Sequence, residues 1–409
     1  MPALEFAKTL MRACASVAPG HRRVLAALAA GLIASCGGGV DSGGTGAPPT
    51  SYASGPITGF GSVIVNGVHF DERSAAISDA EGNLRSRDEL RLGMTSEVRG
   101  SAIGVDADGN DASTASSIVF GSEIVGPLSA NDLAARTLTV LGQTVDVATS
   151  TAFDAPLAGG QAALAVGDIV EVYGRFDAAN GRYAATRIER RIAVVAYRLR
   201  GVVSGLDGAA RTFSIGATRI SYAGLGAANL PATLANGRFV RTLLAVVPNG
   251  AVWNAIRVAD GVAPIENRED ATVKGLVSAF TSTAQFSVNG TSVDARNAQF
   301  PTGTVGLGLG ARVEVRGATV GGVLIAARVT LVTDGDEAGQ SFETRGAITA
   351  IDTTARTFVV HDVTVSYAGT TDFRNGSVAN LLVGRSVEAR GTLSPDGTRL
   401  EASRITFHD

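Results

Sequence analysis

The chain has 409 residues but only two cysteines, Cys14 and Cys36, both near the N-terminus. The rest of the chain therefore contains no disulfide and no thiolate that could bind a metal, so packing alone must hold it together. Aromatic residues make up only 5% of the chain, which leaves few rings for a binding site built on stacking.

Basic residues are also in slight deficit. The net charge of −3 becomes −6 when residues 1–35 are set aside, because that segment holds four basic residues and one acidic residue. A nucleic-acid partner requires a basic surface that displaces counterions. We therefore expect no nucleic acid among the partners.

Recognisable catalytic settings are missing as well. Beyond the N-terminal segment the chain has three histidines, His69, His361 and His408, whose local sequence contexts neither repeat nor pair with acids. The glycine-rich stretches at 59–61 and 306–310 precede predicted strands, whereas a dinucleotide-binding loop must open a helix. Without a base or nucleophile beside partners, we expect a protein that is not an enzyme and uses no cofactor.

The N-terminal sequence has the pattern of an export signal. A basic patch over 21–23 precedes an apolar run over 24–34, which is long enough for the core of a signal peptide and too short to span a bilayer. The run ends in the tetrapeptide Ile33, Ala34, Ser35, Cys36. This tetrapeptide resembles the bacterial lipobox, which implies cleavage after Ser35 and lipidation of Cys36.

The segment 36–54 is dense in glycine and shows no apolar periodicity, which indicates a flexible tether with a reach of roughly 20–25 Å. Gly37 after the lipidated cysteine favours sorting to the outer membrane under the lipoprotein rule. We therefore expect a protein of the cell envelope of a Gram-negative bacterium, anchored by lipid at the outer membrane.

Internal repetition dominates the remainder of the chain. A turn between two alternating strands recurs at residues 67, 142, 216, 290 and 362. A second marker, a glycine before a later strand, recurs at Gly93, Gly167, Gly237, Gly310 and Gly384. Both markers repeat every 70 to 75 residues, so the chain contains five related units.

Each unit reads as about five short strands of period two, opening around a glycine such as Gly59 or Gly126. So small a sheet tends to close on itself, which predicts an all-β array of five-stranded barrels of the oligonucleotide/oligosaccharide-binding (OB) type, with a solenoid of open sheets as the alternative. The predicted bounds are 1–35 for the signal peptide, 36–54 for the tether, and 55–121, 122–192, 193–263, 264–335 and 336–409 for the units.

The third unit diverges from the others. Its segment 239–247 is almost continuously apolar, which predicts a strand buried on both faces.

The repeats resemble a known family. The motif Gly59-Phe-Gly-Ser-Val-Ile-Val-Asn-Gly67, followed by Glu97-Val-Arg-Gly100, is similar to the repeats called domain of unknown function 5666, which occur in tandem in proteobacterial lipoproteins. The resemblance covers about residues 55–407 and is best in units one, two, four and five. It implies no activity and assigns no functional residues.

Two sets of residues are candidates for a site. Glutamate and arginine recur two positions apart on one strand face, in the pairs Glu97/Arg99, Glu314/Arg316 and Glu388/Arg390. These pairs predict either a solvated face with weak ion pairing, which we favour, or a repeated groove for an anionic glycan.

The second set is the loop with Asp106, Asp108 and Asn110, whose alternate oxygen side chains resemble a calcium loop. The acidic residue expected at its far end is replaced by Ser117, and its glycine falls at position four rather than six. A hairpin turn explains the loop more simply, so we expect no metal.

These observations favour a non-enzymatic, membrane-anchored scaffold or binding protein that contacts other envelope components, a protein or a glycan. The alternative is a carbohydrate- or small-ligand-binding module of an envelope or secretion system. A third hypothesis, an enzyme whose site is assembled across units, lacks any supporting motif.

The anchor can be tested directly. We expect Cys36→Ser to abolish the incorporation of labelled palmitate, because the substitution removes the only thiol at the predicted cleavage site. The wild-type chain labelled in parallel is the control. Label in the variant equal to that in the wild type would show that Cys36 is not the lipidated residue.

Overall fold

The computed structural model describes residues 50–262, 265–333 and 339–408. The regular elements of these residues are β-strands and short 3-10 helices. Within the same ranges, no helix is long and apolar enough to span a membrane. The predicted signal peptide, the lipidation site at Cys36 and most of the predicted tether lie outside the described residues.

The strands form five successive units. The first contains β1 (Thr50–Phe60), β2 (Val63–Val65), β3 (Val68–Asp71), β4 (Ala76–Asp79), η2 (Arg87–Glu89), β5 (Thr95–Ser101), β6 (Gly104–Val105) and β7 (Asp111–Phe120). The second contains β8 (Ile124–Asp132), β9 (Thr137–Val140), β10 (Gln143–Phe153), η3 (Gly160–Ala163), β11 (Ile169–Asp177) and β12 (Arg182–Arg191). The third contains β13 (Tyr197–Asp207), β14 (Thr212–Ile215), β15 (Thr218–Ser221), η4 (Ala227–Asn229), β16 (Phe239–Leu244) and β17 (Val252–Asp260).

The last two units follow the same order. The fourth contains β18 (Arg268–Ser282), β19 (Gln285–Val288), β20 (Thr291–Asp294), β21 (Arg312–Val320) and β22 (Val323–Leu331). The fifth contains β23 (Phe342–Ala347), β24 (Ala350–Asp352), β25 (Thr357–Val360), β26 (Val363–Ser366), β27 (Asp372–Arg374), η5 (Val378–Asn380), β28 (Ser386–Leu393) and β29 (Leu400–Phe407).

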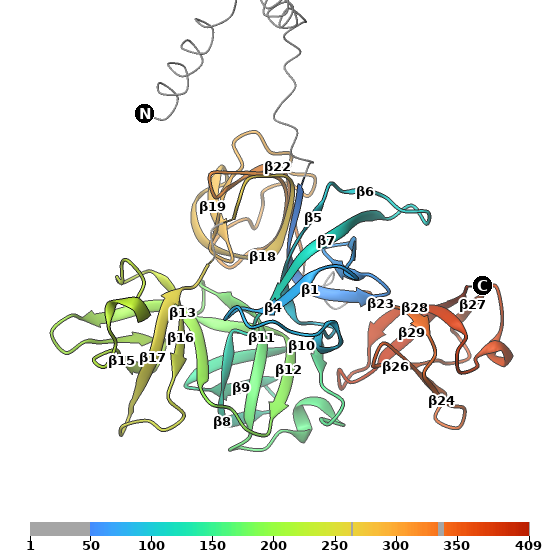
Figure 1. Ribbon diagram of the computed structural model, residues 1–409, viewed down its shortest axis with the longest axis horizontal. Coiled ribbons are helices and arrows are strands. Elements are labelled where there is room, and N and C mark those ends of the chain that lie inside the picture. The colour runs from blue at the N-terminus through green and yellow to red at the C-terminus, as the bar shows by residue number, and fades with distance from the viewer. Residues whose placement is uncertain (1–49, 263–264, 334–338, 409) are drawn as a thin grey trace, which may run out of the picture. The chain divides into compact units, whose positions relative to one another are not determined.

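Each unit closes into a barrel. In the fourth, β18 pairs antiparallel with β19 and β19 with β20, β20 pairs parallel with β22, and β22 returns antiparallel through β21 to β18. Figure 1 shows this barrel nearly end-on, in gold and orange. In the other four units the five main strands pair in the same order: the first with the second, the second with the third, the third with the fifth, the fifth with the fourth, and the fourth with the first. In the first barrel, for example, these strands are β1, β2, β3, β5 and β7. The predicted OB-like barrels are confirmed, and closure removes the free sheet edges that open units would expose.

The second recurring glycine marks the point of closure. Gly93, Gly167, Gly237, Gly310 and Gly384 all adopt a left-handed backbone, with φ between 79° and 96°. In the fourth barrel the Gly310 amide donates to the Val277 carbonyl, and the Val277 amide donates to the Ala311 carbonyl, both at 2.8 Å. The same reciprocal bonds join the fourth strand to the first in the other barrels. Only glycine adopts this backbone without steric cost, which explains its recurrence.

The hairpin turns also agree with the sequence pattern. Asn289 and Gly290 both have positive φ, at 49° and 86°, as the predicted type I′ turn requires. The equivalent turns of the first, second and fifth barrels likewise have two consecutive residues of positive φ. At the equivalent turn of the third barrel, only Gly216 has a positive φ.

Two predictions about the start of the first barrel were wrong: the position of its opening glycine and the end of the tether. In the fourth barrel, a Cβ on the opening glycine, Gly275, would lie 2.1 Å from the turn residue Asn289. In the first barrel the residue in this position is Gly55, whose Cβ would lie 2.3 Å from Asn66, and not the predicted Gly59. The strand begins correspondingly early, so residues 50–54, predicted as the end of the tether, form the start of β1.

The prediction of a doubly buried strand in the third unit was also wrong. Along β16 the side chains of Val240, Thr242 and Leu244 are buried, while the intervening ones are only half-buried. Val247, after the strand, is 72% exposed. An apolar run here reflects one core face and one partly covered outer face.

Neighbouring barrels are joined through their first strands. β1 runs parallel to β18 over 51–54 and to β23 over 59–60, while β8 runs antiparallel to β13. The hydrophobic cores follow these joints, because barrels one and five share one buried cluster and barrels two and three share another. The fourth barrel has its own cluster, which Tyr52 of β1 enters from the first barrel.

The closing glycine predicts a measurable effect on stability. We expect Gly167→Ala to lower the free energy of unfolding by about 1–3 kcal/mol, because alanine disfavours a φ of 96°. No atom lies within 4 Å of the added Cβ, so backbone strain alone is tested.

The control is Gly208→Ala, where the added Cβ also meets nothing within 4 Å and φ lies outside the left-handed region. Urea unfolding followed by circular dichroism measures both variants. Equal midpoints for the two would contradict the role assigned to the left-handed glycine.

Candidate functional site

A chain of ion pairs, most of whose side chains are largely buried, joins the first three barrels. The Arg198 guanidinium of β13 bonds to Glu81, which follows β4, and lies 3.3 Å from Glu171 of β11. The Glu171 carboxylate accepts from Arg191 Nε at 2.6 Å, and Arg191 lies 3.0 Å from Glu189. One arginine of the third barrel thus holds a carboxylate from each of the other two.

The network continues towards the first barrel. Glu189 pairs with Arg187 at 2.5 Å, and both side chains are 7% exposed. Arg187 in turn donates to the Leu92 carbonyl at 3.1 Å. Removing one partner of an ion pair buried to this degree leaves an uncompensated charge, which strongly destabilises the fold. Because the network's residues come from three barrels, it fixes the joints between them.

A cleft of about 650 Å³ lies beside this network. Its volume falls within the range typical of ligand sites, roughly 300–1,000 Å³. Each of the first four barrels contributes to its lining. The charged residues of the lining are Glu97, Arg99, Glu123, Arg175, Arg200, Arg241, Asp260 and Lys274. Five of these eight are basic, so the lining carries a surplus of positive charge in a chain whose net charge is negative.

Two arginines of the third barrel stand side by side in the lining. Arg200 of β13 and Arg241 of β16 are direct cross-strand partners. Like charges in this position are unfavourable. Burial, together with the neighbouring Arg200 and Arg198, lowers the pKa of Arg241. The nearest carboxylate to Arg241 is Glu81, at 3.9 Å.

Glu123, just before β8, faces these arginines. Its Oε1 accepts from Arg200 Nη1 at 2.7 Å, whereas its Oε2 is buried without a hydrogen-bond partner. Burial raises the pKa of the Glu123 carboxyl above its ordinary value, although Arg200 opposes the shift. Arg200 Nε is likewise buried without a partner, and the guanidinium lies 5.5 Å over the Phe239 ring.

The remaining walls of the cleft differ in chemistry. Tyr52, Phe120, Phe176 and Phe239 supply aromatic surface. The part of the lining between β18 and β20 includes residues with short polar side chains, Ser278, Ser287, Asn289 and Thr291. The lining therefore combines basic side chains, aromatic rings and residues with hydroxyl groups.

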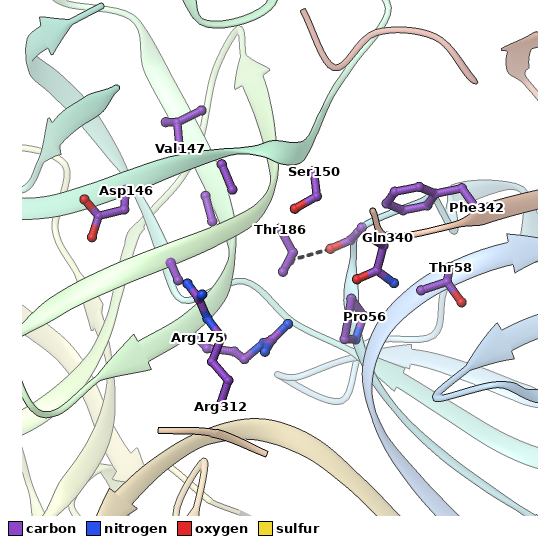
Figure 2. A pocket seen from close by; sticks show the side chains of 14 residues that line it. Pro56, Thr58, Asp146, Val147, Ser150, Arg175, Thr186, Arg312, Gln340 and Phe342 are labelled. Atoms are coloured by element: carbon purple, nitrogen blue, oxygen red, sulfur yellow. Dashed lines mark hydrogen bonds between the residues drawn. The ribbon is translucent and has the colours of Figure 1, made fainter. Parts of the chain in front are cut away.

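A smaller cavity of about 120 Å³ lies nearby. Figure 2 shows Pro56 and Phe342 on one side of it and Asp146 and Val147 on the other. The hydrogen bond from Thr186 Oγ1 to the Gly93 carbonyl, 2.6 Å, crosses this region and ties barrel two to barrel one. Its volume is below that of typical ligand sites, so the larger cleft is the better candidate.

The predicted glutamate/arginine pairs form within each strand. Arg99 lies 3.9 Å from Glu97, and the equivalent distances are 2.8 Å for Glu314/Arg316 and 2.7 Å for Glu388/Arg390. The structure does not bring the three pairs to one surface of the cleft, because its lining includes Glu97 and Arg99 but neither of the other pairs.

The two remaining pairs contact residues of other strands. Arg316 lies 3.3 Å from Asp111 of the first barrel, and Arg390 lies 2.9 Å from Glu343 of its own barrel. Both arginines thus bridge acidic groups beyond their own pair.

The predicted acidic loop is a hairpin turn between β6 and β7. Asp106 Oδ1 accepts from the amides of Asp108 and Asn110, at 2.9 and 2.8 Å, and Gly109 has a φ of 86°. Asp108 turns to Arg345 of the fifth barrel, at 2.7 Å. Within the described ranges, no group of three or more acidic, histidine or cysteine side chains is placed to hold a metal.

Two of the three histidines lie near acidic residues that are distant from them in sequence. His69 Nδ1 lies 4.0 Å from Asp106, and His408 Nε2 lies 3.7 Å from Glu388. Near them, burial and the proximity of Glu388 raise the pKa of Glu343 to about 7. Residues distant in sequence therefore form a titratable cluster where barrels one and five meet.

Sequence reasoning missed Arg200, Arg241 and Glu123, although one signal was present. Four residues after the closing glycine, four units have a glutamate, Glu97, Glu171, Glu314 or Glu388. The third unit has Arg241 at that position. This charge reversal at one position of the repeat distinguishes the third unit from the other four.

The chain was compared with known proteins. Three segments, residues 125–189, 274–330 and 345–406, match the family model described as domain of unknown function 5666. They coincide with barrels two, four and five. No curated protein matches the chain.

The ion-pair network predicts a large effect at one residue. We expect Arg198→Met to lower the free energy of unfolding by about 3 kcal/mol, because Glu81 and Glu171 lose a shared buried partner. Trp253, the single tryptophan, lies in the third barrel and reports its unfolding in urea by fluorescence.

The matched control is Arg238→Met in the same barrel, since the Arg238–Asp260 pair is nearly half exposed and should contribute less than about 1 kcal/mol. Similar urea midpoints for the two variants would show that the network does not stabilise the joint.

Proposed function

We propose that this chain, an array of tandem repeats of the domain of unknown function 5666 type, is a non-catalytic, lipid-anchored binding protein of the bacterial cell envelope. One ligand or partner group is held in the cleft formed by the first four barrels. The observation that carries the proposal is the cleft itself, about 650 Å³, whose five basic lining residues come from four barrels.

The arrangement of the barrels supports one composite site rather than five equivalent ones. β1 contacts β18 and β23, while β8 contacts β13, so the outer surfaces of the five barrels are covered differently. Equivalent weak sites would gain from effective concentration only if each stayed accessible. The fixed joints favour a single site at the junction.

The N-terminal sequence supports the location. A signal-like apolar run, a lipobox-like tetrapeptide and a glycine-rich segment precede β1. On this reading, lipid on Cys36 holds the array at the outer membrane, and the segment before β1 sets its distance from the surface. A ligand of the envelope is then the natural occupant of the cleft.

In-cell photo-crosslinking tests the proposal. A photoreactive residue at Ser287, in the cleft lining, should capture a defined envelope component, protein or glycan, identified by mass spectrometry. The control position is Thr354, exposed on a turn of the fifth barrel. Identical adducts at both positions, or none at Ser287, would refute a binding role for the cleft.

A further inference from the structure

We infer that the cleft recognises an acidic saccharide, whose carboxylate binds at the Arg200/Arg241 pair and whose hydroxyl groups meet polar residues of the fourth barrel in the lining. The inference rests on the proposed function and names its ligand class. It depends on three independent features: a reversed cross-strand charge, an unpaired buried carboxylate oxygen, and a lining that holds both aromatic rings and hydroxyl-bearing residues.

The reversed charge is visible when the barrels are compared at one cross-strand position. Lys274 stands opposite Glu314 in the fourth barrel, and Arg345 stands opposite Glu388 in the fifth. A cation on the first strand is thus balanced by a glutamate on the fourth. In the third barrel Arg200 stands opposite Arg241, and both line the cleft.

This substitution is unfavourable for folding. Burial and the adjacent guanidiniums lower the pKa of Arg241, although Glu81 opposes the shift. The side chain is nevertheless 22% exposed and lies in the cleft lining. Residues that oppose stability in this way are commonly kept for binding. The group that relieves two adjacent guanidiniums is an anion, and carboxylate matches their planar donors.

The unpaired oxygen adds a second requirement. Glu123 is 5% exposed, contacts Arg200 through Oε1, and leaves Oε2 without a donor. A ligand that brings both an anion and hydroxyl groups satisfies both sides, since a hydroxyl can donate to one group and accept from another.

The walls distinguish a saccharide from a simple anion. Phe176 and Phe239 lie with ring centroids 6.0 Å apart and offer an apolar face, on which the C–H face of a sugar ring can pack. Ser287 of the fourth barrel, which is half-buried, contributes a residue with a hydroxyl group to the same lining. Apolar bodies with a few placed polar groups are typical of sites for small ligands.

The test is titration calorimetry with the full-length lipidated protein in detergent. The probes are oligosaccharides that contain galacturonate, glucuronate or neuraminate, together with neutral counterparts such as galactobiose beside digalacturonate. We expect at least one acidic probe to bind at least tenfold more tightly than its neutral counterpart. Arg241→Gln should weaken that binding at least tenfold while the melting temperature is unchanged or higher, because a cross-strand repulsion is removed.

The matched control is Arg219→Gln, which removes an exposed arginine of the same barrel that is not part of the cleft lining and should leave binding unchanged. If no acidic probe binds, if neutral probes bind equally well, or if Arg241→Gln binds as the wild type does, the inference is wrong. Capture of a protein or neutral glycan at Ser287 together with such a result would refute the ligand class but leave the binding role intact. Absence of both capture and binding would refute both.

Discussion

The reciprocal pair of backbone hydrogen bonds between the fourth strand and the first is the constraint on which the other features depend. It turns a sheet of short strands into a closed barrel, and it requires a left-handed residue at the point where the fourth strand begins. Once each unit is closed, its first strand can extend past the barrel and pair with a neighbour. The joints through β1 and β8 are therefore consequences of closure, and the cleft is a consequence of the joints.

The repeat period, the closing glycines and the type I′ turn were predictable from sequence because they are local requirements of the backbone. A backbone position in the left-handed region favours glycine whatever surrounds it, so Gly310 and its equivalents can be predicted from sequence. The start of the first barrel could not be predicted from sequence in this way. Gly55 is required by contact with Asn66, a packing constraint that leaves no periodic signal, and Gly59 sits in a similar local context.

The candidate site was largely hidden for a related reason. Its charged residues come from different barrels, and which barrels meet depends on strand pairings such as that of β1 with β18, which no local pattern encodes. The same holds for His69 and Asp106, which look isolated in sequence yet lie 4.0 Å apart. What sequence could have offered is the comparison of equivalent positions between units, where Arg241 stands out from four glutamates.

That comparison bears on how a repeat array acquires a function. Barrels that must all close need the same glycines and the same core faces, so these positions stay uniform. The outer-facing position four residues after the closing glycine is free of that constraint, and a glutamate there balances a cation in barrels four and five. Exchanging it for arginine in a single barrel leaves closure intact but places two guanidiniums together beside a cleft.

The repulsion between Arg200 and Arg241 is tolerable because the third barrel is held elsewhere, by the core it shares with the second and by Arg198 in the ion-pair network. Stability supplied by the repeated features thus allows one unit to carry an unfavourable, and on our proposal functional, charge arrangement.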